Sequence, residues 1–147
     1  LFAAGSHIDL ITKDKRIAGP AGISPDCGSD TCPNLLEFQR AAANGLAVRA
    51  NLRALASLFS GDGGDGFDAL LRHSGAPLLA DRIGDALADA QETARAIEVE
   101  WSELLQQDPE ALRDLHAKVK VLTDLLKSQF VTVLNLSASQ EGNGDND

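Results

Sequence analysis

The sequence predicts an all-α protein, an up-and-down helical bundle that ends in a long antiparallel helical hairpin. In residues 75–137, apolar side chains recur every three or four positions, which places them on one face of a helix. The polar stretch 106–110 interrupts this pattern, so two helices joined by a very short turn are expected. The apolar residues at this spacing are Leu79, Ile83, Leu87, Ala90, Ala94, Ile97, Trp101 and Leu104 in the first helix, and Leu112, Leu115, Val119, Leu122, Leu126, Phe130 and Val133 in the second.

The short turn carries signals for the start of the second helix. Asp108 is a residue type favoured at the N-cap, where its carboxylate accepts hydrogen bonds from free N–H groups of the first turn. Pro109 follows at the first helical position, where its missing N–H costs nothing. A turn this short predicts antiparallel helices, and at about 1.5 Å per residue each is expected to run roughly 40 Å.

Shorter helices are expected before the hairpin, because two helices alone cannot cover both apolar faces. Residues 1–138 are therefore predicted to form a single bundle. The polar and acidic residues 139–147 are predicted to form a tail that frays. The other predicted helices are residues 2–17, 34–43, 46–59 and 67–74, with a helix break or C-cap at Asn44 and Gly45.

Composition narrows the class of partner. The chain has 147 residues, enough for one domain with a core, and a net charge of −9. Nucleic-acid binding needs clustered Lys and Arg, so this charge argues against a nucleic-acid partner. No run reaches the roughly 20 apolar residues that span a membrane. Methionine is absent even at position 1, so we expect a processed form, an expression product or one piece of a longer protein.

The only two cysteines, Cys27 and Cys32, lie in a loop rich in Gly, Pro, Ser and Asp. Their spacing favours a local disulfide, which would indicate an oxidising compartment. A metal site would need two further soft ligands, and none is near in sequence. A reduced pair is the remaining alternative.

The glycine-rich stretch 61–66 and its surroundings carry three aspartates, Asp62, Asp65 and Asp68. Calcium-binding loops of twelve residues place ligands at alternate positions and end on a glutamate, and this spacing does not match. We therefore expect a solvated loop here. The histidines, His7, His73 and His116, likewise form no helical zinc motif, and no nucleophile elbow occurs.

Several segments, taken in order, resemble the C-terminal half of the imelysin family of peptidases. Residues 11–22 (ITKDKRIAGPAG) resemble the basic helix end that runs into a KPLG-like turn in that family. Glu37 followed by residues 49–52 (RANL) resembles its ESPYS…DLRANL segment at matching spacing. Residues 38–40 (FQR) replace the Ser-Pro-Tyr part of that segment.

The resemblance continues through the second half of the chain. Residues 66–71 (GFDALL) and 75–81 (GAPLLAD) resemble the family's GLDALL…GAPELADRL segment. Residues 125–127, 131–136 and 145–147 resemble its last helix and its acidic NDNDGD-like end. The resemblance thus covers nearly the whole chain in the order and spacing of the family.

What the resemblance implies is a bacterial envelope protein, periplasmic or a lipoprotein, built from two helical bundles and linked to iron acquisition. Some imelysins are described as metallopeptidases, and the family hallmark is a GxHxxE motif in the N-terminal half, proposed to bind metal. No histidine of this chain carries a glutamate three residues later. Iron or another divalent metal is therefore expected only in a full-length protein, on the half that bears this motif.

The resemblance also names three candidate interface or binding residues. Glu37, Arg49 and Asn51 match the family's central motif and are expected to line the interface between the two halves. The alternative for Asn51 is a hydrogen bond or cap within the bundle. Glu37 and Arg49 are alternatively ion pairs at the surface, each contributing under about 1 kcal/mol.

The function expected from this reasoning is that of an iron-uptake-associated envelope protein, with a binding rather than a catalytic role for this chain. Its expected partners are the N-terminal half of the same protein and another envelope protein. One alternative is a part of a metallopeptidase whose metal site lies in that N-terminal half, since no catalytic motif occurs here. The other alternative is a structural bundle that only binds proteins.

Overall fold

The computed structural model describes residues 1–133, so the end of the predicted hairpin and the predicted acidic tail at 139–147 lie outside the described residues. The described part is helical and contains no strand, which confirms the all-α prediction. Four long helical segments form the bundle, and two short helices lie at its ends. The long segments are α1 (Phe2–His7) continuing into η1 (Ile8–Ala18), α2 (Asn44–Ser60), α4 (Pro77–Ala96), and α6 (Pro109–Asp124) continuing through η5 (Leu125–Phe130) to α7 (Val131–Val133); the short helices are α3 (Phe67–His73) and α5 (Trp101–Gln107).

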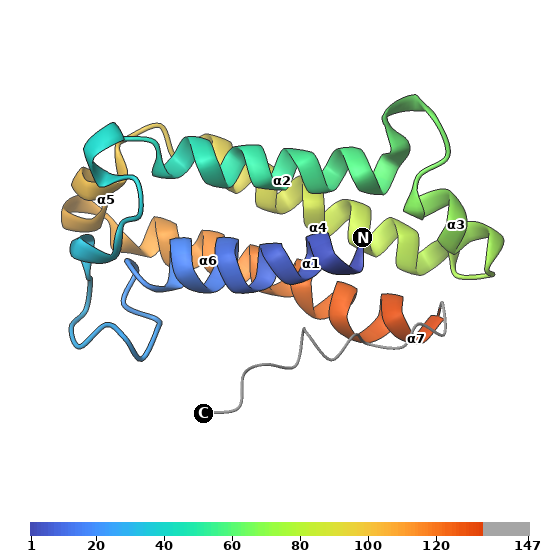
Figure 1. Cartoon of the computed structure of the whole chain (residues 1–147), viewed down its shortest axis with the longest axis horizontal. Helices are drawn as coiled ribbons and strands as arrows, with labels where there is room; N and C mark the ends of the chain where they lie inside the picture. Colours follow the sequence, from blue (N-terminus) through green and yellow to red (C-terminus); the bar gives the residue numbers. More distant parts are fainter. Residues whose placement is uncertain (134–147) are drawn as a thin grey trace.

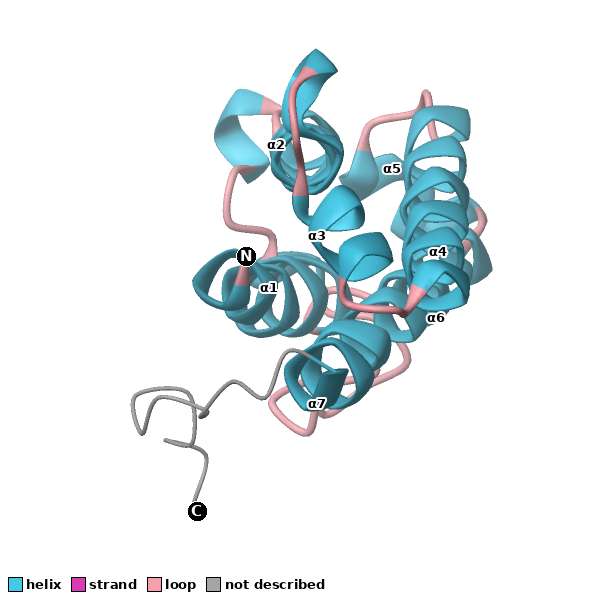
Figure 2. Ribbon diagram, turned by 90° about the vertical axis from the view of Figure 1, so that its right-hand side faces the viewer, coloured by secondary structure: helices cyan, strands magenta, loops and turns pink. Residues whose placement is uncertain are grey.

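The long segments alternate in direction along the chain, as an up-and-down bundle requires (Figure 1). The η1 helix packs against α2 and α6, and α4 packs against the same two helices, so the four segments form a closed square. Viewed along the bundle, α3 lies across the near end and α5 lies at the far end (Figure 2).

The core lies between these four segments and consists of aliphatic side chains with few aromatics. Each long helix contributes one apolar stripe at helical spacing, which is the pattern that the sequence shows. The largest fully buried apolar side chains are Ile17, Val48, Leu52, Leu55, Leu71, Ile83, Leu112, Leu115, Val119, Leu122 and Phe130.

The predicted hairpin is present as an antiparallel pair, because α4 and α6 pack side by side. The prediction of one unbroken helix from residue 75 to the turn is wrong. Helix α4 ends at Ala96, so its 20 residues span roughly 30 Å, and Ile97 has an extended backbone. The Glu100 carboxylate then accepts a hydrogen bond of 2.6 Å from the Ser102 N–H and caps a separate helix, α5.

The short turn at Asp108 and Pro109 therefore joins α5 to α6. Pro109 occupies the first helical position as predicted. Asp108 precedes it at the N-cap position, but its side chain makes no capping hydrogen bond, so the predicted capping role is wrong. The start of α6 relies instead on the fixed φ of proline.

The helix predicted over residues 34–43 is replaced by two single 3₁₀ turns, Pro33–Leu35 and Gln39–Ala41. Ala42 adopts a left-handed backbone with φ of 48°, which ends the second turn. The predicted break at Asn44 is instead the start of α2. Its buried side-chain carbonyl accepts a hydrogen bond of 2.9 Å from the Phe38 N–H, so the loop is fastened to the first turn of the helix.

The loop that follows η1 contains the predicted disulfide, between Cys27 and Cys32. Helix α6 holds the same loop, because Arg113 donates to the carbonyl oxygens of Ala21 at 3.1 Å and Asp30 at 2.8 Å. Gly22 is required at its position, since it has φ of +78° and an added Cβ would lie 2.0 Å from the Asp30 carbonyl oxygen.

Replacing Cys27 and Cys32 together with serine is expected to lower the free energy of unfolding by about 2 kcal/mol, the loop-entropy value for so short a ring. The fold should persist, because the Arg113 hydrogen bonds still hold the loop. Urea denaturation with and without a reducing agent measures this. The reducing agent should destabilise the wild type and leave the double variant unchanged; equal stability of the oxidised wild type and the variant would contradict the prediction.

Among residues 1–133, no helix has both the length and the apolar character that crossing a membrane requires. This agrees with the absence of an apolar run in the sequence.

Candidate functional site

Glu37 lies in the loop between η1 and α2 and forms an ion pair with the Arg16 guanidinium at 2.6 Å. The hydrogen bond from Arg16 lowers the pKa of Glu37, although partial burial opposes the shift. The same guanidinium lies over the Phe38 ring, 5.2 Å from its centroid, in a cation–π contact. Glu37 is thus engaged within the chain and holds the loop to the end of η1.

Asn51 lies on α2 and faces η1, where its side-chain N–H donates to the Thr12 hydroxyl at 2.9 Å. Thr12 is fully buried and lies one turn before Arg16 on the same helix. Glu37 and Asn51 therefore contact neighbouring turns of η1. Asn51 also lines a cavity of about 220 Å³ between α1 and α2, so part of its side chain faces this opening.

Arg49 points to the opposite side of α2, toward the C-terminal end of α4. Its Nη1 group donates to the carbonyl oxygens of Ile97 at 3.3 Å and Ala94 at 3.5 Å. These carbonyls lack partners within the helix because α4 ends there, and a cation at a helix C-terminus also complements its dipole. The three predicted residues thus do not converge on one site.

A second cavity, of about 130 Å³, lies beside Arg49 between α2 and α4. It is lined by Arg49, Arg53, Gln91 and Arg95. The sequence could have shown that Arg49 and Arg53 share one face of α2, because they are one turn apart. The same holds for Gln91 and Arg95 on α4. What the sequence did not show is that these two faces meet.

An open apolar groove extends along the face formed by α1, α2 and α3. It consists of the cavity at Asn51 and a larger one of about 400 Å³, and Leu58 borders both. Leu58 and Leu70 are 49% and 45% exposed, so the groove presents apolar side chains to solvent. We call this surface the α1–α3 groove; its lining residues are Ala4, His7, Ile8, Asn51, Ala54, Leu55, Leu58, Asp65, Gly66, Phe67, Ala69, Leu70 and His73.

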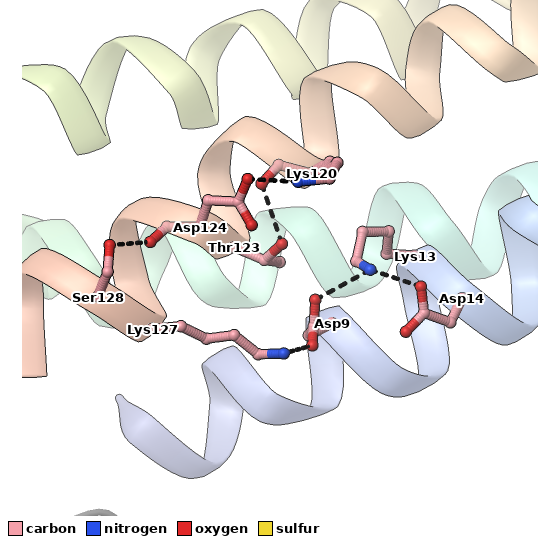
Figure 3. A network of polar contacts seen from close by, with 8 residues as sticks. All are labelled: Asp9, Lys13, Asp14, Lys120, Thr123, Asp124, Lys127 and Ser128. Atoms are coloured by element: carbon pink, nitrogen blue, oxygen red, sulfur yellow. Dashed lines mark hydrogen bonds and ion pairs between the residues drawn. The ribbon is translucent and has the colours of Figure 1, made fainter. Parts of the chain in front are cut away.

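The most buried charge that sequence reasoning missed is Asp9, which is 3% exposed. Lys13 and Lys127 point at its carboxylate from two different helices (Figure 3). Burial alone would raise the pKa of Asp9, but hydrogen bonds from Lys127 and Lys13 outweigh it, and the pKa is lowered. The pair Asp9–Lys127 joins η1 to η5, both of which are π-helical.

The charges around Asp9 also shift the pKa values of Lys13 and His116. Burial would lower the pKa of Lys13, but hydrogen bonds to Asp14 and Asp9 raise it, so the ammonium form is favoured. Burial lowers the pKa of His116, and the positive charge of Lys13 lowers it further, which favours the neutral imidazole. The ion pairs of Asp9 with Lys13 and Lys127 form a structural network that holds η1 to η5.

The imelysin resemblance implies a metal ion in the full-length protein, and a site for it would need several donor side chains close together. Within residues 1–133, no three side chains among His, Cys, Asp and Glu come together as a metal site would require. Cys27 and Cys32 are joined to each other and supply no thiolate. The donor set of the described part therefore does not fit a metal ion.

Comparisons of the chain with protein-family models, with curated proteins and with solved structures each found no match. The imelysin assignment thus stays a prediction from the sequence segments quoted above. The geometry offers two surfaces for a binding role: the α1–α3 groove and the arginine-lined cavity.

Proposed function

We propose that this chain is the binding, non-catalytic half of an imelysin-like protein of the bacterial periplasm or outer envelope, associated with iron uptake. In this role it docks a second helical bundle, the N-terminal half that carries the GxHxxE motif. The observation that carries the proposal is the α1–α3 groove, an apolar surface that remains open after the four long helices have packed.

Three features support this occupant. An apolar helix face fits an apolar groove of this kind, with anchoring side chains at every third or fourth position. Asn51, which belongs to the segment that resembles the family's central motif, lies in the wall of the groove. The disulfide between Cys27 and Cys32 suits an oxidising compartment such as the periplasm.

The test mixes the purified chain with a purified N-terminal imelysin half from the same organism and measures binding by sedimentation velocity and calorimetry. Leu58→Glu places a charge where both cavities meet and is expected to weaken the complex at least tenfold. Val121→Glu is the matched control, because Val121 is 55% exposed on α6, outside the groove. It should leave the affinity unchanged.

Two results would overturn the proposal. One is an absence of any complex with the wild-type chain, and the other is a complex that Leu58→Glu and Val121→Glu weaken equally. Iron titrated into each sample gives a further readout. It should bind when the half with the GxHxxE motif is present, and tight binding by this chain alone would show that the role assigned to it is wrong.

A further inference from the structure

The cavity between α2 and α4 has an unusual concentration of positive charge for an acidic protein. Three of the 13 Lys and Arg residues of the chain line it, namely Arg49, Arg53 and Arg95. Among the ion pairs of residues 1–133, none involves any of these three guanidinium groups. No carboxylate of the described part thus lies within ion-pair distance of these three side chains.

The guanidinium of Arg49 is held in place. Its hydrogen bonds to the carbonyl oxygens of Ala94 and Ile97 both use Nη1, which leaves the N–H groups of Nε and Nη2 without an acceptor among the described residues. Gly45 leaves room on one side, since an added Cβ would lie 3.1 Å from Nη1 and 2.9 Å from the indole nitrogen of Trp101. Donors thus crowd this region.

The remaining wall supplies further donors and no negative charge. Gln91 donates through its amide nitrogen to the Leu52 carbonyl oxygen at 3.2 Å, which fixes its side chain beside the cavity. Each amide nitrogen carries two N–H groups, so one remains free. Arg53 and Arg95 are exposed and reach the cavity from opposite helices.

From this arrangement we propose that the cavity binds a phosphate group, either the free ion or the terminus of a small phosphomonoester. Guanidinium groups bind phosphate oxygens through two parallel hydrogen bonds, and three of them exceed what one carboxylate can accept. The volume of about 130 Å³ is that of a few water molecules, which suits one small tetrahedral group better than a tricarboxylate. This inference is independent of the proposed docking function.

Calorimetry of the purified chain with inorganic phosphate, at neutral pH and constant ionic strength, tests the proposal. Arg53→Gln and Arg95→Gln should each weaken binding about tenfold, and the double variant about a hundredfold, since each removes charge-assisted hydrogen bonds. Arg82→Gln is the matched control, because Arg82 lies on α4 and donates to Gln129, far along the helix from Arg95. Its affinity should equal that of the wild type.

Further probes identify the ligand class. Glycerol 3-phosphate that binds as tightly as phosphate indicates a phosphomonoester ligand, and phosphate alone binding indicates the free ion; either result supports the proposal. It is overturned if phosphate gives no more binding than chloride, if citrate binds more tightly than phosphate, or if the double variant keeps the wild-type affinity. Circular dichroism of each variant verifies that its helix content is unchanged.

Discussion

Replacing Asp9 with asparagine is expected to lower the free energy of unfolding by about 3 kcal/mol. Removing one member of a buried ion pair leaves its partner uncompensated, which costs about 3–5 kcal/mol in fully buried cases. The lower end applies here because the Lys127 side chain is 55% exposed and Lys13 keeps its contact with Asp14. Urea denaturation at neutral pH measures the loss.

The pH dependence provides a second readout, because the pKa of Asp9 is lowered in the folded state. A lowered carboxyl pKa contributes stability that is fully present above the unfolded value, about 3.9, and is lost as the pH falls through the folded value. The stability difference between the wild type and Asp9→Asn should therefore stay constant from about pH 5 to 8 and shrink below about pH 4.

Asp14→Asn is the matched control for this prediction. Asp14 also pairs with Lys13, but its side chain is 46% exposed, so the change is expected to cost under about 1 kcal/mol. Equal losses for the two variants would show that burial of Asp9 carries no special weight, and a fully stable Asp9→Asn protein would contradict the ion-pair argument altogether.

Asp9 also shows where sequence reasoning reaches its limit. The prediction of a helix over residues 2–17 is confirmed, but nothing in the sequence indicated that most of it is a π-helix. The helix is π-helical from Ile8 to Ala18, with wider turns closed by bonds such as that from the Gly19 N–H to the Asp14 carbonyl oxygen at 3.0 Å. In this helix the polar Asp9 and Thr12 are buried while the apolar Leu10 is 37% exposed, a distribution that residue type alone does not predict.

The break after Ala96 had a different cause. The apolar spacing from Leu79 to Leu104 is compatible with one helix, and Ile97 and Trp101 are both buried as that pattern predicts. The interruption depends on a side chain 45 residues away from Ala94, since Arg49 takes up the free carbonyls, and on capping by Glu100. Local periodicity contains no information about such a distant donor.

For the candidate site, too, the sequence predicted which residues are of interest but not which distant residues they contact. The family resemblance selected Glu37, Arg49 and Asn51, and all three make specific contacts between elements. Which residues they face was not predictable, because it depends on which helices are neighbours in the bundle. Arg53 and Arg95 line one cavity only because α2 packs against α4, and the sequence does not show that contact.

The largest effect on stability is expected from Trp101→Ala, which should lower the free energy of unfolding by about 4 kcal/mol, within the range of 3–5 for large-to-small core changes. Trp101 is 2% exposed and begins α5, directly after the Glu100 cap. Its ring lies beside Gly45 at the start of α2, because a Cβ added to Gly45 would lie 2.9 Å from the indole nitrogen, so the truncation would open a cavity between α5 and α2. Urea denaturation followed by circular dichroism is the suitable measurement, since this is the only tryptophan.

Trp101→Phe separates lost volume from lost polarity. The indole N–H of Trp101 is buried without a partner among the described residues, which costs about 1–3 kcal/mol. Phenylalanine removes that unpaired donor while keeping most of the apolar contact, so the two effects oppose each other and the net change should stay within about 1.5 kcal/mol. Equal losses for Trp101→Phe and Trp101→Ala would contradict the packing argument, because phenylalanine keeps most of the apolar contact. A loss under about 1 kcal/mol for Trp101→Ala would show that the ring contributes little to the core at this end of the bundle.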